Sequence, residues 1–160
     1  MAYKRKTWKE KLEDDKNFPK VVKIKGKMRK SWGTETVVIP RPRDVDALMK
    51  KIPKGKVTTI NEIRAAVAKK NKATIGCPIT CGIFANIAAH VADEEEAKRK
   101  KRITPYWRTL KGEGEINSKY PGGLINQISR LKHEGHKVEW NKNKTKAKVV
   151  GFEKKLFKLV

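Results

Sequence analysis

Residues 57–71, VTTINEIRAAVAKKN, carry the clearest helix signal in the chain. Thr59 and Glu62 stand at capping-box spacing, and the apolar residues between Ile60 and Val67 recur on one helical face. This stretch therefore predicts a short helix that begins at about residue 60.

A second helix is predicted directly downstream, in residues 77–102, CPITCGIFANIAAHVADEEEAKRKKR. Pro78 suits a first helical turn, and the small side chains of Ala85, Ala88 and Ala89 permit close packing. The DEEE patch reads as the tail of this helix, and the basic run after it is either a solvated connector or a phosphate contact. Two helices joined by a short turn indicate a helix-turn-helix.

The charge of the chain favours a polyanionic partner. Forty Lys and Arg residues against 17 Asp and Glu leave a net charge of +23. Lys and Arg release condensed counterions from phosphates, so nucleic acid is the leading partner class. A membrane surface is disfavoured because there is no basic amphipathic helix with a broad apolar face and no apolar run of about 18 residues. Acidic protein partners, or a protein that is merely very basic, are the alternatives.

The N-terminus is basic but has no apolar core of a signal peptide, so a cytoplasmic, nucleoid-associated location is expected. Cys77 and Cys81 are the only cysteines. They could share a helix face, but a zinc site needs four ligands, and no second Cys or His pair stands at ligand spacing. Two small buried thiols are expected, with no metal and no cofactor.

The length of 160 residues indicates one domain with an extension rather than two domains. Residues 1–35 are interpreted as a basic, partly disordered N-terminal arm, residues 36–152 as the folded domain, and residues 153–160 as a C-terminal tail.

The arm carries a clear excess of basic residues. Its first 30 residues hold 12 Lys and Arg against 4 Asp and Glu, and they allow a short strand near Val21–Ile24. Trp8, Phe18 and Trp32 either attach the arm to the domain or await a partner.

The remaining patterns complete a fold that is mainly α with a small β content. Asp44 is expected to cap a helix that ends at Ile52, before a proline. Residues 103–110, ITPYWRTL, look like a short strand, and residues 112–123 form a glycine-rich loop.

A third helix is predicted for Leu124–His133, with Gly135 as its stop. Residues 136–152, HKVEWNKNKTKAKVVGF, then alternate around an Asn/Lys turn and predict a β-hairpin. Helices followed by a hairpin suit a winged helix-turn-helix domain, with the hairpin as the wing. Lysines at alternate positions would line this wing and face phosphates: Lys142, Lys144, Lys146 and Lys148.

Residues 104–111, TPYWRTLK, lie directly behind the basic run. On their own, their two aromatic residues belong either to the core or to the floor of a site. The surrounding motifs bear on this choice. IPKGKVTTINEIRAAVA, PYWR and YPGGLINQISRLKHEGH resemble, in order and spacing, the C-terminal domain of the O6-alkylguanine-DNA alkyltransferases, over about residues 36–140.

In that family the helix-turn-helix enters the minor groove and a damaged base is flipped out of the duplex. A cysteine in the motif Pro-Cys-His-Arg then takes the alkyl group. A histidine, a water and a glutamate make that cysteine a thiolate, which is the reactive form. The resemblance implies the same fold and the same kind of DNA contact.

The reactive motif itself differs. Pro105 and Arg108 match it, but Tyr106 stands in place of the cysteine and Trp107 in place of the histidine. Glu134 matches the glutamate and is expected to serve as a structural hydrogen-bond acceptor. The resemblance is therefore to the cysteine-less, alkyltransferase-like branch, which binds alkylated DNA without repairing it.

The loop that covers the flipped base in the family is matched by Tyr120, Gly122, Gly123 and Leu124, with Pro121 in place of its usual serine. Stacking in such a slot contributes roughly 1–3 kcal/mol per base. The predicted base pocket comprises Tyr106, Trp107, Arg108, Tyr120, Gly122, Gly123 and Glu134.

The DNA contacts are expected from the helix-turn-helix and the wing. Ile60 replaces the family's tyrosine, and Ile83 or Phe84 stands near the position of its intercalating arginine, where an apolar wedge can still unstack bases. The predicted contact residues are Thr58, Thr59, Ile60, Thr80, Ile83, Phe84, Asn86, Lys142 and Lys144.

Three functions remain open at this point. The first is a monomeric, non-catalytic protein that recognises O6-alkylguanine-type lesions in double-stranded DNA and supports repair, with nucleotide excision repair proteins as partners. The second is a general nucleic-acid-binding or architectural protein whose pocket is closed by its own aromatic residues. The third is an enzyme with a relocated nucleophile, Cys77 or Cys81, for which no activating base is evident.

Overall fold

The computed structural model describes residues 4–33 and 35–160. The α-helices are α1 (Trp8–Leu12), α2 (Met28–Trp32), α3 (Pro42–Met49), α4 (Ile60–Lys70), α5 (Pro78–Ala97) and α6 (Gly123–His133). The strands are β1 (Lys20–Lys23), β2 (Thr36–Ile39), β3 (Thr58–Thr59), β4 (Ile75–Gly76), β5 (Thr109–Leu110), β6 (Val138–Trp140) and β7 (Ala147–Val149). Two 3₁₀ turns, η1 (Tyr106–Arg108) and η2 (Phe152–Lys155), complete the chain.

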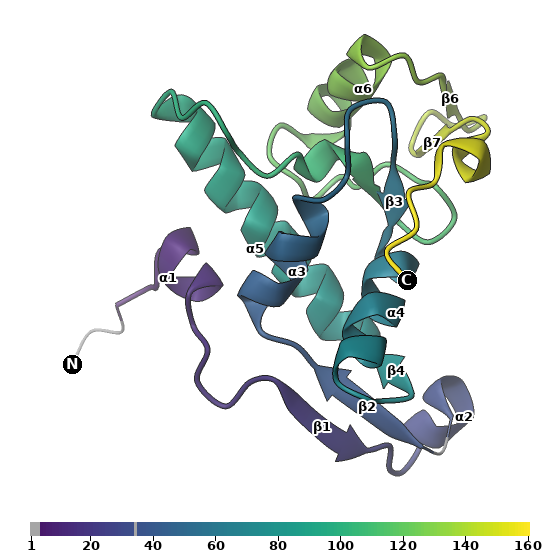
Figure 1. The fold of residues 1–160 in the computed structure, drawn as a ribbon. Coiled ribbons are helices and arrows are strands. Elements are labelled where there is room, and N and C mark those ends of the chain that lie inside the picture. The colour runs from purple at the N-terminus through teal and green to yellow at the C-terminus, as the bar shows by residue number, and fades with distance from the viewer. Residues whose placement is uncertain (1–3, 34) are drawn as a thin grey trace.

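The helix pair α4–α5 is the centre of the fold, and the sequence predicted both helices. Thr59 is the N-cap of α4, where its hydroxyl accepts the Glu62 backbone N–H at 3.4 Å. Pro78 occupies the first turn of α5, which continues through the DEEE patch to Ala97. In Figure 1, α5 crosses the whole molecule behind α3 and α4.

Two small sheets hold the helix pair. β2 pairs antiparallel with β1 and parallel with β4, so β4 leads from the sheet directly into α5. β3 pairs in parallel with β5, which places the start of α4 beside the end of η1. Because residues 106–108 form a 3₁₀ turn, the strand that the sequence predicted for residues 103–110 shortens to Thr109–Leu110.

The N-terminal residues fold onto the domain, where the sequence predicted a partly disordered arm. The predicted short strand is β1, and the indole of Trp8 stacks on the His90 ring of α5 with centroids 4.2 Å apart. Phe18 meets Phe84 edge to face at 6.1 Å, and Trp32 packs beside the buried Ile24. The aromatic residues therefore attach this segment; residues 1–3 and 34 of the predicted arm lie outside the described residues.

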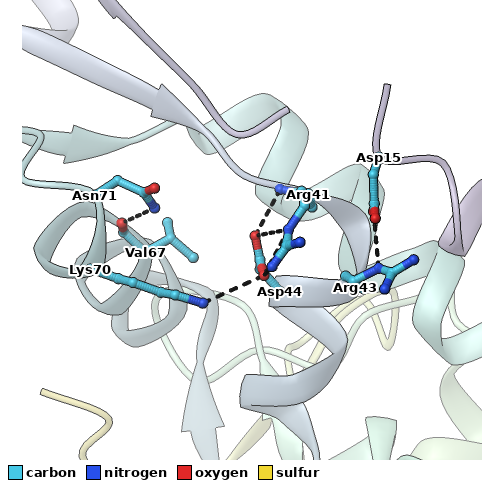
Figure 2. Close-up of polar contacts among 7 residues, drawn as sticks. All are labelled: Asp15, Arg41, Arg43, Asp44, Val67, Lys70 and Asn71. Atoms are coloured by element: carbon cyan, nitrogen blue, oxygen red, sulfur yellow. Dashed lines mark hydrogen bonds and ion pairs between the residues drawn. The ribbon is translucent and has the colours of Figure 1, made fainter. Parts of the chain in front are cut away.

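A polar network fixes the orientation of α3 against its neighbours (Figure 2). The Asp44 carboxylate accepts hydrogen bonds from the Arg41 backbone N–H at 3.1 Å and from the Arg41 guanidinium at 2.8 Å. Asp44 is thus the third residue of the helix rather than its N-cap, because Pro42 starts the helix earlier than predicted. Lys70 at the end of α4 reaches the same carboxylate at 3.6 Å, and Arg43 pairs with Asp15 at 2.9 Å.

The core has two main parts. One is formed by α3, α4 and α5 together with Tyr106 and Tyr120. The other joins β3, β5, α6 and the β6–β7 hairpin, and Leu131 of α6 is fully buried there. The predicted third helix and hairpin are confirmed, and Gly135 ends α6 with a φ of 92°, which suits glycine.

The C-terminal residues also contact the domain. Val57 donates to the Lys155 carbonyl at 3.0 Å, and Phe157 donates to the Val57 carbonyl at 2.7 Å. Leu159 packs against the first core. Over residues 4–33 and 35–160, no helix has both the length and the apolar character that crossing a membrane requires.

Candidate nucleic-acid interface

Tyr106 occupies the interior of the domain. Its side chain is 0% exposed, and its ring meets Trp107 and Tyr120 edge to face at centroid distances of 5.3 Å and 5.6 Å. Its hydroxyl accepts a hydrogen bond from the Asn126 side chain at 2.9 Å, and burial raises the pKa of Tyr106. Tyr106 is therefore part of the packed core.

Asn126 and Arg130 of α6 support this aromatic cluster, and the sequence analysis missed both. Asn126 also donates to the Pro121 carbonyl at 2.9 Å and accepts from the Arg130 guanidinium at 3.1 Å. The Arg130 guanidinium lies 4.6 Å from the centroid of the Trp107 ring and is paired with Glu96. The available signal was their four-residue spacing on the face of α6 opposite its apolar residues.

Arg108 and Glu134 form a largely buried ion pair below the cluster. The Arg108 guanidinium donates to both Glu134 oxygens, at 2.9 and 2.7 Å, and to the Ile52 carbonyl at 2.7 Å. Burial alone would raise the pKa of Glu134, but the hydrogen bonds from Arg108 outweigh it and hold the pKa below its usual range. Glu134 thus anchors Arg108, in line with the structural role expected of it.

A groove of about 530 Å³ lies between the exposed face of α5 and the loop before α6. Ile79 and Ile83 of α5 are 54% and 51% exposed beside it, and the buried Tyr120 forms part of the opposite wall. Lys111 and Lys119 also line the groove. Apolar side chains beside cations are the combination that a base inserted from a phosphate-bearing duplex requires.

Asn86 gives this groove a polar group without a partner. Its side-chain oxygen is buried and has no hydrogen-bond partner within the described residues, and the residue lines the groove. A buried amide that lacks a partner in the free protein can bond to a ligand group at little desolvation cost.

The predicted base pocket is divided in the structure. Tyr120 lines the α5 groove, whereas Trp107 and Arg108 line a second concavity of about 600 Å³ together with Lys50, Lys101 and Arg102. Gly122 has a φ of 78°, and a Cβ there would lie 2.5 Å from the Cβ of Asn126, so the turn before α6 requires glycine. Gly122 and Gly123 shape the turn, and neither lines either concavity.

Several predicted DNA contacts are buried instead. Thr58 and Thr59 are 0% and 4% exposed, because the Thr58 hydroxyl donates to the Phe157 carbonyl and Thr59 caps α4. Phe84 is 8% exposed and belongs to the core, so of the two candidates for an apolar wedge only Ile83 is accessible. Thr80 is partly buried, and its hydroxyl has no partner within the described residues.

The other predicted contacts are accessible. Ile60 lines the α5 groove from the first turn of α4. Lys142 and Lys144 are exposed in the turn of the β6–β7 hairpin, which Asn141 closes by accepting the Thr145 backbone N–H at 2.8 Å. The structure therefore brings Ile60, Ile83 and Asn86 to the α5 groove. Lys142 and Lys144 do not line this groove and lie in the turn of the β6–β7 hairpin.

The two cysteines are buried. Cys81 is 0% exposed, and burial raises its pKa to about 12, so it is a thiol at neutral pH. The Cys77 sulfur accepts the Thr80 backbone N–H at 3.5 Å at the start of α5. Within the described part of the chain, no group of three or more His, Cys, Asp or Glu side chains is arranged to hold a metal ion.

The chain has the fold of the alkyltransferase-like proteins. Two solved structures share it, although no protein-family model and no curated protein matches the sequence. One is Atl1 of S. pombe in complex with damaged DNA containing O6-carboxymethylguanine, with 19% identity, a TM-score of 0.53, and coverage of 73% of this chain and 94% of that chain. The other is S. pombe ATL in complex with DNA, with 20% identity, a TM-score of 0.54 and the same coverage.

Proposed function

We propose that this chain is a non-catalytic protein that binds double-stranded DNA and recognises O6-alkylguanine-type lesions, and that it thereby supports DNA repair. The observation that carries the proposal is the α5 groove, which is open, partly apolar and flanked by cations. The likeness in fold to a protein bound to damaged DNA supports it. The net charge of +23 supplies the attraction to phosphates.

In this proposal α4 and α5 are a helix-turn-helix and the β6–β7 hairpin is a wing. α5 approaches the minor groove with Ile79 and Ile83 as apolar wedges, and Lys142 and Lys144 contact phosphates. The extruded base lies against Tyr120 in the α5 groove, and Tyr106 forms the packed floor beneath it.

No alkyl transfer to the protein is expected. The position of the family's cysteine holds a tyrosine whose pKa burial raises, and Cys81 is a buried thiol with a pKa of about 12. In this proposal the protein marks the lesion and passes it to nucleotide excision repair proteins. It acts as a monomer in the cytoplasm, at the nucleoid.

The test is a titration with paired duplexes, one containing O6-methylguanine and one unmodified, at two salt concentrations. Tighter binding to the methylated duplex at both salts is expected, because the contribution of the pocket does not depend on counterion release. Equal affinities would contradict lesion recognition. A methyl label that moves from the DNA to a cysteine would contradict the non-catalytic part.

One observation favours a second function, that of a general nucleic-acid-binding or architectural protein. Tyr106 and Tyr120 are only 0% and 3% exposed, so the aromatic residues close the former reaction centre. That function predicts a steep salt dependence with no preference for the methylated duplex. The same titration distinguishes the two functions.

A further inference from the structure

The segment from Lys20 to Thr36 carries an unusual concentration of positive charge. It contains six Lys and Arg residues and a single acidic residue, Glu35. Lys23, Lys25 and Arg29 are exposed, and none of the three takes part in an ion pair within the described part of the chain. Self-repulsion among such uncompensated charges destabilises the fold, and a polyanionic partner would relieve it.

These cations surround a concavity rather than a flat surface. A groove of about 420 Å³, the β1–α2 groove, is lined by Lys23, Ile24, Lys25, Arg29, Glu35 and Thr36. Its floor is rigid, because Ile24 is 5% exposed and its backbone N–H donates to the Glu35 carbonyl at 3.0 Å. The cations are therefore held around a fixed hollow.

The β1–α2 groove is tied to the start of α5. Thr36 exchanges hydrogen bonds with Thr74, and the next residue, Val37, pairs with Ile75 of β4. Pro78 follows Ile75 by only three positions, which is at most about 10 Å of extended chain. In Figure 1, β1, β2, β4 and α2 lie together at the end of the molecule where α5 begins.

Such a distance matches the geometry of a duplex. A DNA strand advances about 3.4 Å along the axis per phosphate, so about 10 Å corresponds to roughly three base pairs. We propose that the β1–α2 groove binds the phosphate backbone of the same duplex, a few base pairs beyond the site occupied by α5. This rests on the proposed function, and it gives the N-terminal segment the role of lengthening the DNA footprint.

The test is a triple variant, Lys23→Ala, Lys25→Ala and Arg29→Ala, on the full chain. Lys54→Ala, Lys56→Ala and Lys154→Ala form the matched control, because these lysines are also exposed and unpaired in the described structure and the change in net charge is the same. Lys54 and Lys56 lie in the connection from α3 to β3, at the opposite end of the molecule from β1 and α2 (Figure 1). Circular dichroism and thermal melting establish that all variants are folded.

Affinity is measured against salt for two unmodified duplexes, one of about 8 base pairs, which the α5 site alone fills in this proposal, and one of about 20 base pairs. With the longer duplex, the salt slope of the groove variant is expected to fall by up to about 2.7, or about 0.9 for each phosphate that the variant no longer neutralises. Between about 50 and 200 mM salt, wild type then loses roughly 40-fold more affinity than the variant. With the shorter duplex the two slopes are expected to coincide. A variant with Lys23→Arg and Lys25→Arg should keep the wild-type slope.

The failure of each proposal has its own signature. Wild type that binds neither duplex refutes the proposed function, and the groove assignment with it. Wild type that binds both while the groove variant behaves like the control refutes the groove assignment alone. An equal loss of affinity on the short and the long duplex also refutes it, because the phosphates concerned would then lie within the α5 site.

Discussion

Replacement of Tyr106 tests whether its ring is part of the packed core. The side chain is 0% exposed and is packed between Trp107 and Tyr120. Truncation of a buried aromatic side chain to alanine typically costs about 3–5 kcal/mol, and Tyr106→Ala is expected to lower the free energy of unfolding by this amount. The hydroxyl contributes less, because Asn126 keeps its bond to the Pro121 carbonyl, so Tyr106→Phe is expected to cost about 0.5–1.5 kcal/mol.

Urea denaturation followed by circular dichroism measures both variants, and a duplex titration follows on those that remain folded. Tyr106→Phe should keep the wild-type ratio of affinities for methylated and unmodified duplex, since the ring lies beneath the groove and not in it. A destabilisation below about 1 kcal/mol for Tyr106→Ala would show that the ring is not part of the core. A collapse of the affinity ratio in Tyr106→Phe would show that the hydroxyl touches the base. Either result would refute the reasoning.

Three further predictions concern the neighbouring polar groups. Glu134→Gln leaves the Arg108 charge without its partner and is expected to destabilise the fold by about 3 kcal/mol in urea denaturation; no change would mean that water compensates the cation. Burial depresses the pKa of His136 in the folded state. The contribution of His136 to stability should therefore be full above about pH 6.5, its pKa in the unfolded chain, and should fall as the pH drops towards its pKa in the folded protein. His136→Gln should flatten this part of the curve of stability against pH. Asn86→Ala should reduce the preference for methylated duplex about 2- to 10-fold and leave the affinity for unmodified duplex unchanged; an equal loss on both duplexes would contradict a base contact.

The helices that the sequence predicted are those with strong local signals. The Thr59 cap, the proline at position 78 and Gly135 after α6 act within one or two helical turns, so their effect can be read without knowing the tertiary structure. The β6–β7 hairpin was equally predictable, because alternation and an Asn/Lys turn are also local features.

The folded structure of the N-terminal segment could not be predicted in the same way. β1 is held by pairing with β2, and α1 packs on α5 through Trp8 and His90, which are 82 positions apart. High charge and few apolar residues indicate disorder when a segment is considered alone. Here a small number of aromatic contacts to distant residues outweighs the composition.

The sequence placed two of the predicted pocket residues together, but it could not show which of the predicted contacts face the surface. The order of the motifs placed residues 104–111 and Tyr120 in one region, and Tyr106 and Tyr120 are in contact. Burial is a tertiary property, so the sequence could not show that Thr58 and Phe84 face inwards while Ile83 faces outwards. Thr58 shows this most clearly, because its hydroxyl partner is the carbonyl of Phe157, 99 positions away.

The contacts of Tyr106 and Glu134 are consistent with the proposed non-catalytic function. In the family that the sequence resembles, a glutamate orients the histidine that activates the cysteine. Here Glu134 is bound to Arg108, whose hydrogen bonds hold the pKa of the carboxyl below its usual range, so Glu134 serves as an anchor for the Arg108 guanidinium.

The Tyr106 ring is 0% exposed and the Trp107 N–H is buried, so neither group is presented at the surface. The α5 groove is therefore the part of the candidate site that can meet a base. A protein arranged in this way can retain recognition while having no route to alkyl transfer, because recognition needs only stacking surface, a hydrogen-bonding amide and phosphate contacts.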